Sequence, residues 1–339
     1  MRKYRQVVEF ANFICHFGND ELLDYLNEIV LPAFLEGQRV RMWGGSKYLF
    51  LDVKLVNLKS HWEPGALTPA LVGRFVLDTE LQRDQILVGN KIVADTQKLQ
   101  SAPSSLFVLL LDNHKLIYSK QVSGAPGLSA FRTTAEMMLK WRWTAYINEI
   151  VEKNKTDREA DAEIPRITKR ALVESIQAPR LEIVPLAGHQ NLNDLVNQFK
   201  LLKEISIKVV RPNAEINNDG LFDTVEAARS QVNADATSLI HRNSDGLNKA
   251  QSIKQIAPAM QGNAVVTLRG TGPTDAKLTG TNEEMSVKEP MDVPPSVQRG
   301  AAVMFDTFKR LLSQKILRVG RIVNSRKNLA KLESLKNDG

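Results

Sequence analysis

Alternating apolar and polar positions predict β-strands in the first third of the chain. In residues 47–58 every second side chain from Leu49 to Leu55 is apolar, which places these side chains on one face of a strand. Residues 71–77 show a second strand-like run after a loop that contains Pro64 and Pro69. These segments favour a sheet with one face packed against a core.

The clearest hairpin lies between residues 105 and 122. Two apolar runs, 105–111 and 115–122, flank Asp112, Asn113 and His114, and Asp and Asn tolerate the backbone conformations of tight turns. The first run, SLFVLLL, does not alternate, as is typical of a central strand that is buried on both faces.

Helical spacing of apolar residues predicts three helices around this sheet, at residues 3–17, 20–36 and about 128–152. The second of these has a plausible N-cap at Asp20 and Gly37 just past its end. Residues 1–155 are therefore predicted to form an α+β domain, an antiparallel sheet with covering helices.

A second α+β domain is predicted after a charged linker. A strand at 181–186, an amphipathic helix at 191–203 and a strand at 205–210 suggest a βαβ unit with parallel pairing. Further helices and strands, with a last long helix at about 301–317, suggest a ferredoxin-like or split βαβ sandwich. The predicted division is a first domain at 1–155, a linker at 156–178, a ferredoxin-like domain at 179–318 and a basic tail at 319–339.

The amino-acid composition is that of a globular protein and excludes several other classes of protein. The chain of 339 residues is 43% hydrophobic and 24% charged, as expected of globular domains and not of disordered ones. A single cysteine, Cys15, excludes intramolecular disulfides and favours a reducing compartment. No run is long enough to span a membrane and the start does not look like a secretory signal, so we expect a cytoplasmic protein.

The positive charge is concentrated at the end of the chain. Residues 299–339 hold ten basic and three acidic residues, so the whole net charge of +7 lies there. If residues 317–335 are helical, they form a basic amphipathic segment whose uses are phosphate contact, a membrane surface or docking on a protein partner. The segment has no aromatic anchor, which argues against a membrane. The predicted phosphate contacts are Arg318, Arg321, Arg326, Lys327 and Lys331.

One strand carries a possible nuclease pattern. Asp52 and Lys54 lie two apart and share a strand face, and Glu36 (or Glu28) is a candidate earlier acid. In metal-dependent nucleases the carboxylates of such a set hold Mg²⁺ and the lysine steadies the attacking water. The alternative is a solvated strand face with an ordinary charge pair. No other metal site is predicted, since no two of the five histidines have helical ligand spacing.

Several stretches, KYLFLDVKLVNL, LVGRFVLDTELQRDQIL, SAPSSLFVLLLDNHKLIYSKQVSGAP and RGAAVMFDTF, resemble an uncharacterised, sporadically distributed bacterial family of unknown function. The resemblance extends over most of residues 1–317 and implies a setting in phage defence, without an activity or catalytic residues. The order of elements in residues 178–339 is also similar to RNA-recognition folds, but the aromatic run of those folds is absent.

The leading hypothesis is thus a cytoplasmic, non-catalytic protein that binds DNA or RNA through its basic C-terminal segment. A metal-dependent nuclease that uses Asp52 and Lys54 is the first alternative. The second is an assembly protein, either a homo-oligomer or a subunit whose basic tail docks on another protein.

Overall fold

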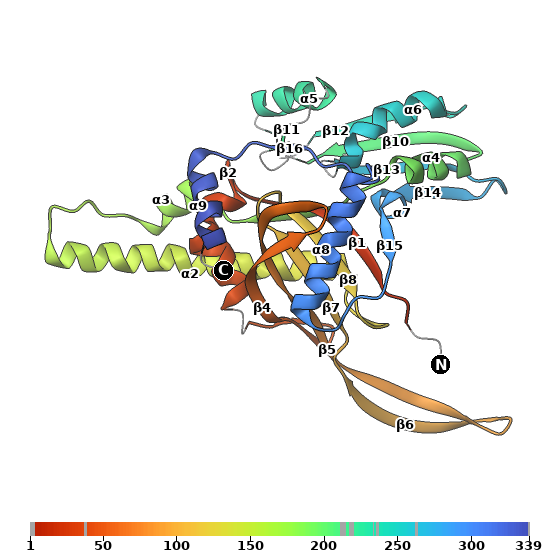
Figure 1. Ribbon diagram of the computed structural model, residues 1–339, viewed down its shortest axis with the longest axis horizontal. Coiled ribbons are helices and arrows are strands. Elements are labelled where there is room, and N and C mark those ends of the chain that lie inside the picture. The colour runs from red at the N-terminus through yellow and green to blue at the C-terminus, as the bar shows by residue number, and fades with distance from the viewer. Residues whose placement is uncertain are drawn as a thin grey trace.

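The chain is described from a computed structural model that covers residues 4–36, 39–210, 215–216, 220–232, 234, 237–261 and 264–337. Two antiparallel sheets, one of ten strands and one of four, each carry helices (Figure 1). A short pair, β11 (Glu215–Ile216) with β16 (Arg321–Ile322), lies apart from both. The predicted α+β class is confirmed.

The large sheet has the strand order β15-β1-β8-β7-β5-β4-β3, and all of its pairs are antiparallel. Strand β2 pairs with β1, β6 pairs with β5, and β9 pairs with β1. The strands are β1 (Val7–Phe17), β2 (Asp20–Glu21), β3 (Arg41–Trp43), β4 (Ser46–Ser60), β5 (Glu63–Val88), β6 (Lys91–Ser101), β7 (Ser104–Leu110), β8 (Lys115–Lys120), β9 (Arg180–Pro185) and β15 (Lys288–Pro290). The hairpin predicted at 105–122 is present as β7 and β8.

The helix predicted at residues 3–17 is wrong, because Val7–Phe17 is strand β1. This strand pairs with β8, β9, β15 and β2, and most of its side chains are buried. Burial on both faces removes the alternation that identifies a strand, and the remaining apolar spacing then resembles that of a helix.

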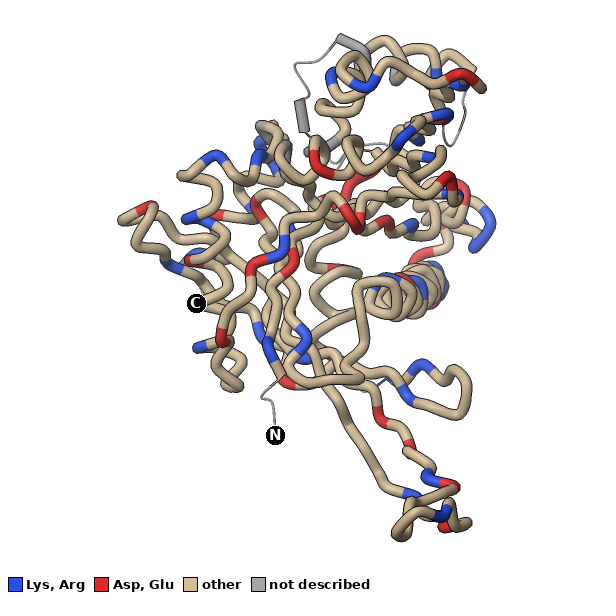
Figure 2. The backbone as a smooth tube through the Cα atoms, turned by 90° about the vertical axis from the view of Figure 1, so that its right-hand side faces the viewer, with Lys and Arg blue, Asp and Glu red and all other residues tan. Residues whose placement is uncertain are grey.

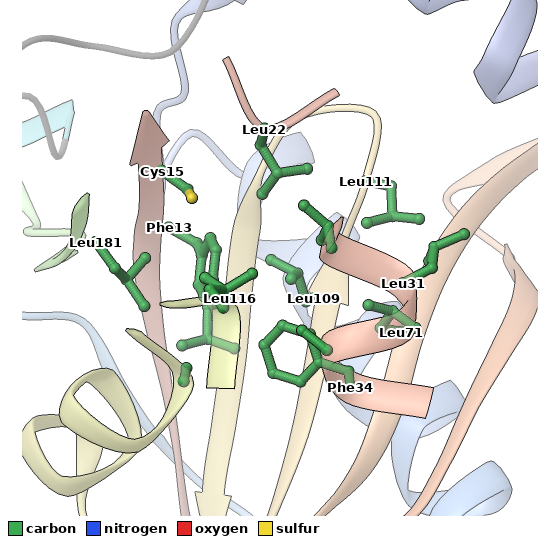
Figure 3. Packing of buried hydrophobic residues seen from close by; sticks show 14 of the residues in the cluster. Phe13, Cys15, Leu22, Leu31, Phe34, Leu71, Leu109, Leu111, Leu116 and Leu181 are labelled. Atoms are coloured by element: carbon green, nitrogen blue, oxygen red, sulfur yellow. The ribbon is translucent and has the colours of Figure 1, made fainter. Parts of the chain in front are cut away.

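One face of the large sheet packs against helices from three parts of the chain. The helix predicted at 20–36 is a run of three short pieces, a 3-10 turn (Leu22–Tyr25), a π turn (Leu26–Val30) and α1 (Leu31–Leu35). The long helix α2 (Leu128–Ala160) and the C-terminal helix α9 (Arg326–Asn337) cover the same face. Figure 3 shows side chains from β1, β5, β7, β8, β9 and the 22–35 segment pointing toward one another in this core.

The opposite face of the large sheet is covered by α8 (Val297–Ser313), the predicted last long helix. Strands β9 and β15 and helix α8 come from the range predicted as the second domain, yet they complete the large sheet and its core. The predicted domain boundaries stay predictions.

The small sheet has the order β12-β10-β13-β14. Its strands are β10 (Leu201–Val209), β12 (Thr237–Arg242), β13 (Ala264–Thr271) and β14 (Lys277–Thr281), and α4 (His189–Gln198) and α6 (Lys249–Ile256) contribute to its core. The predicted parallel βαβ unit is wrong, because its first strand, β9, belongs to the large sheet and β10 has only antiparallel neighbours. A ferredoxin-like arrangement is therefore not observed among the described strands.

The remaining helices are short. They are α3 (Lys169–Ser175), α5 (Gly220–Gln231), the 3-10 helix Ala257–Gln261 and α7 (Asn282–Met285). Part of the predicted linker is thus helical, since α2 continues to Ala160 and α3 follows.

The central strand β5 extends beyond the large sheet and forms an arm with β6. Strand β5 continues past its pairing with β7 and pairs there with β6, so that residues 79–101 form a two-stranded hairpin. Figures 1 and 2 both show this hairpin projecting away from the rest of the molecule.

Candidate nucleic-acid interface

The basic tail predicted to bind phosphates is docked on the protein's own core. In α9, Leu332 and Leu335 are buried in the core that α2 also covers. The ammonium of Lys331 donates to the backbone carbonyls of Leu23 and Asp24, both at 2.7 Å. Burial lowers the pKa of Lys331, although the carboxylate of Glu28 opposes this shift. Lys331 therefore anchors the helix and is not available to a ligand.

The other predicted phosphate contacts have different environments. Arg318, Arg326 and Lys327 are exposed, and none of the three forms an ion pair with an acid among the residues that the structure describes. The backbone of Arg321 pairs with Ile216, while its side chain lies outside the described residues. Phosphate contact through these four residues stays a prediction.

The proposed nuclease strand is interrupted at the predicted site. Leu51 pairs with Arg74 and Lys54 pairs with Val72, so that Asp52 and Val53 together lie opposite one residue of β5. Asp52 has a φ of 53°, and this bulge breaks the period of two that the prediction assumed. The Asp52 carboxylate lies 3.6 Å from Nε of Arg74.

The nuclease hypothesis also needs carboxylates gathered around a metal ion. Glu36 is exposed and ends α1. Within the described ranges, no group of three or more His, Cys, Asp or Glu side chains could hold a metal ion. The geometry therefore gives no support to a Mg²⁺ site built on Asp52, Lys54 and Glu36.

A different cationic surface lies at the edge strand β3. The turn from β3 to β4 is formed by Gly44 and Gly45, with φ values of 57° and 78°. Two positive φ values match the twist of a tight hairpin and favour glycine. The turn places Arg41 directly opposite Tyr48 and Trp43 opposite Ser46.

Arginine and aromatic side chains alternate on this surface. The guanidinium carbon of Arg41 lies 4.4 Å from the ring centre of Tyr48 and 6.0 Å from that of Trp43. The guanidinium carbon of Arg39 lies 5.5 Å from the ring centre of Trp141 on α2. Such stacking orients each guanidinium along a ring face and leaves N–H groups at its edge for a ligand. We call Arg39, Arg41, Trp43, Tyr48 and Trp141 the arginine–aromatic edge.

The edge is held in place from α2 and is open to solvent. Nε of Arg41 donates to Oγ1 of Thr134 at 3.0 Å, which fixes β3 against the helix. Trp43 is 69% exposed. In the part of the chain that the structure describes, neither Arg39 nor Arg41 has a carboxylate partner, whereas nearby Lys47 lies 3.5 Å from Asp78. Two arginines thus keep their charge for an external anion.

Sequence reasoning missed this surface. The stretch RVRMW at 39–43 alternates arginine with apolar residues and ends in tryptophan just before a Gly-Gly turn. That pattern predicts a hairpin strand with both arginines and the tryptophan on one face. It is the signal by which the sequence could have indicated this surface.

A hollow of about 400 Å³ lies between the two sheets, next to the start of α2. Its lining combines three carboxylates with three cations, and these groups interact within the protein. Glu9 lies 3.9 Å from Lys288, and Arg132 donates to the carbonyl of Leu181. Burial raises the pKa of Glu9, and Lys288 and Lys120 partly oppose that rise. The balanced charge makes this hollow a poorer polyanion site than the arginine–aromatic edge.

Comparison with known proteins gives no assignment. No model of a protein family matches the chain, and no curated protein matches it. Among the described residues, no helix has the combined length and apolar character needed to cross a bilayer.

Proposed function

We propose that this protein binds single-stranded nucleic acid along the arginine–aromatic edge, and that this binding is non-catalytic. The observation that carries the proposal is Trp43, whose ring is largely exposed beside the guanidinium of Arg41, which has no carboxylate partner among the described residues. Exposed aromatic rings next to cations are the two elements that single-strand binders combine, one for base stacking and one for the backbone.

A single strand suits this surface better than a duplex. The faces of its bases are accessible, so a base can stack on Trp43 while its phosphates reach Arg39 and Arg41. The edge presents no set of side chains arranged to read base edges. Binding should therefore tolerate different sequences, as expected when backbone contacts and stacking dominate.

The C-terminal segment contributes secondary contacts in this proposal. Helix α9 packs on the same sheet face as α2, which carries Trp141. Arg326 and Lys327 are exposed on α9, and Arg318 is exposed before it. In this proposal the bound nucleic-acid strand continues from the arginine–aromatic edge to these cations. The resemblance to a bacterial family adds a host-defence setting to the proposal.

The test compares two exposed tryptophans. Trp43→Ala should weaken binding of a labelled single-stranded oligonucleotide by about 5- to 150-fold, since one base stack contributes about 1–3 kcal/mol. Trp62→Ala is the matched control, because Trp62 is 48% exposed but lies at the turn between β4 and β5. Fluorescence anisotropy at low salt measures both. Equal affinities for the two variants, or no binding by the wild type, would overturn the proposal.

The salt dependence tests the role of the arginines. Each neutralised phosphate on a single strand contributes about 0.7 to the log–log slope of affinity against salt. The double variant Arg39→Gln, Arg41→Gln should therefore reduce the slope by about 1.4. Arg326→Gln with Lys327→Gln tests the tail in the same way without removing α9 from the core.

A further inference from the structure

The arm is a continuation of the central strand β5 of the large sheet, paired with β6. Strand β5 pairs with β7 up to Val76 and with β6 from Thr79 to Val88, and the register of the β5–β6 ladder shifts by one residue between Arg83 and Gln85. About ten residues of each strand thus extend beyond the sheet, a length of about 33 Å at 3.3 Å per residue. Among the described elements, these residues of β5 and β6 pair only with each other, so both edges of the arm are open.

Apolar side chains are exposed on both faces of the arm, and one face carries them near both of its ends. Two cross-strand pairs lie on this face, Leu81 with Leu99 near the sheet (the root pair) and Leu87 with Ile92 near the turn (the tip pair). Their exposed fractions are 53%, 66%, 72% and 71%. An isolated two-stranded hairpin is only marginally stable in water, and such an apolar patch indicates an interaction surface.

The charges of the arm indicate that its partner is not a polyanion. Residues 79–101 contain three basic and three acidic residues, so the arm carries no net charge. Arg83 forms an ion pair with Asp95, and Lys98 lies 2.7 Å from Glu80. Figure 2 shows both signs of charge along the arm, in contrast to the net positive chain. Two of the three cations of the arm are thus paired within it, and its exposed apolar pairs remain for a partner.

The order of residues on this face is the same when read from either end. The face begins with the apolar root pair and ends with the apolar tip pair. Between them lie polar residues, among them Arg83 and Gln85. A two-fold contact requires such a pattern, because the same patch must complement itself. When two arms stack face to face and antiparallel, the root pair of each lies against the tip pair of the other.

We propose that the arm is a dimerisation element, which joins two copies of this chain by antiparallel stacking of their apolar faces. This inference does not depend on nucleic-acid binding, since it uses no residue of the arginine–aromatic edge. A face about 33 Å long and about 10 Å wide covers about 330 Å² per copy, below the roughly 800 Å² of a standard interface. The dimer is therefore expected to be weak and reversible.

Sedimentation equilibrium of the full chain, from about 1 to 300 µM, the range in which a weak dimer associates, measures this association. Leu87→Asp buries a charge in the proposed contact and should weaken dimerisation at least tenfold. Val88→Asp is the matched control, since Val88 is 56% exposed on the adjacent position and the opposite face, and it should leave dimerisation unchanged. A wild type that stays monomeric over this range, or equal effects of the two variants, would overturn the proposal.

A mixing experiment tests the antiparallel geometry. In the proposed dimer Leu81 of one arm lies against Leu87 of the other, so Leu81→Lys and Leu87→Asp should each weaken self-association at least tenfold. An equimolar mixture should form a heterodimer, because one contact then keeps two leucines and the other joins the introduced ammonium and carboxylate groups. If each variant is monomeric and the mixture is also monomeric, the arm docks elsewhere and the proposed arm-to-arm contact is wrong. Circular dichroism of each variant establishes that the fold is retained.

Discussion

Strand β5 contains two regions of opposite character within one continuous ladder. From Ala70 to Val76 it is flanked by β4 and β7, and its apolar side chains are at most 5% exposed. From Thr79 to Val88 it is flanked by β6 alone, and Leu87 is 72% exposed. Both regions are paired strands, so backbone pairing does not distinguish them.

The difference is the presence of helices. The first region lies between α2 on one face and α8 on the other, in two separate cores. The second region has no helix on either face in the described structure. Strand pairing is therefore enough to shape the arm, whereas burial from both faces gives the body its stability.

The largest effect should come from a matched pair of truncations in this strand. Phe75 is fully buried and its ring contacts those of Tyr48, Phe50 and Phe131. Phe75→Ala should reduce the free energy of unfolding by about 3–5 kcal/mol. Leu87→Ala should change it by less than about 0.5 kcal/mol, because an exposed side chain leaves no cavity.

Urea denaturation at protein concentrations below about 1 µM, where the arms are separate, measures both values. A loss above about 2 kcal/mol for Leu87→Ala would contradict the comparison, since it would show that the arm is part of the cooperative unit.

A second pair of residues compares a buried histidine of the body with an exposed one. His114, in the β7–β8 turn, is fully buried, and burial lowers its pKa from 6.5 to about 3, with Lys115 and His16 adding to this shift. The imidazole of His114 therefore takes up a proton in the unfolded chain when the pH is lowered below about 6.5, whereas in the folded chain it stays neutral until the pH approaches 3. Stability should fall as the pH drops from about 6.5 toward 3, by about 2 kcal/mol at pH 5.

His114→Asn should flatten this pH dependence. Asparagine tolerates the φ of 54° that His114 adopts, and it does not titrate. The control is His61→Asn, because the side chain of His61 is 97% exposed. Melting temperatures from pH 4.5 to 7.5 compare the slopes. Identical slopes for wild type and His114→Asn would show that another group dominates acid destabilisation.

The body's hairpin was predictable from sequence and the arm was not. Residues 105–122 combine apolar runs with an Asp-Asn turn, and both signals agree with the structure. In the arm, the polar residues of LQRDQ interrupt the apolar pattern, and only Gly89 and Asn90 indicate its turn. A strand that is exposed on both faces needs no consistent alternation, just as β1, buried on both faces, shows none.

The basic C-terminal segment and the arginine–aromatic edge also differ in how far the sequence predicts them. The basic tail was visible as a charge excess, but local sequence does not show that Lys331 reaches carbonyls about 300 residues earlier in the chain. The arginine–aromatic edge needed Trp141 and Thr134 from α2, which only the tertiary fold brings to β3. Composition revealed where the charge is, and packing decided which cations remain free.

The smallest expected effect compares two lysines on α9. Lys331→Met removes two charge-assisted hydrogen bonds to the carbonyls of Leu23 and Asp24, and should reduce the free energy of unfolding by about 1–2 kcal/mol. Lys327→Met, on the exposed side of the same helix, should change it by less than about 0.5 kcal/mol. If α9 were a solvated tail, the two variants would be equally stable, and hydrogen exchange along α9 would be fast in both. A difference in stability between the two variants, with slow exchange along α9 in the wild type, would show that this basic helix unfolds together with the body of the protein. The arm would then be the element that is formed by strand pairing alone.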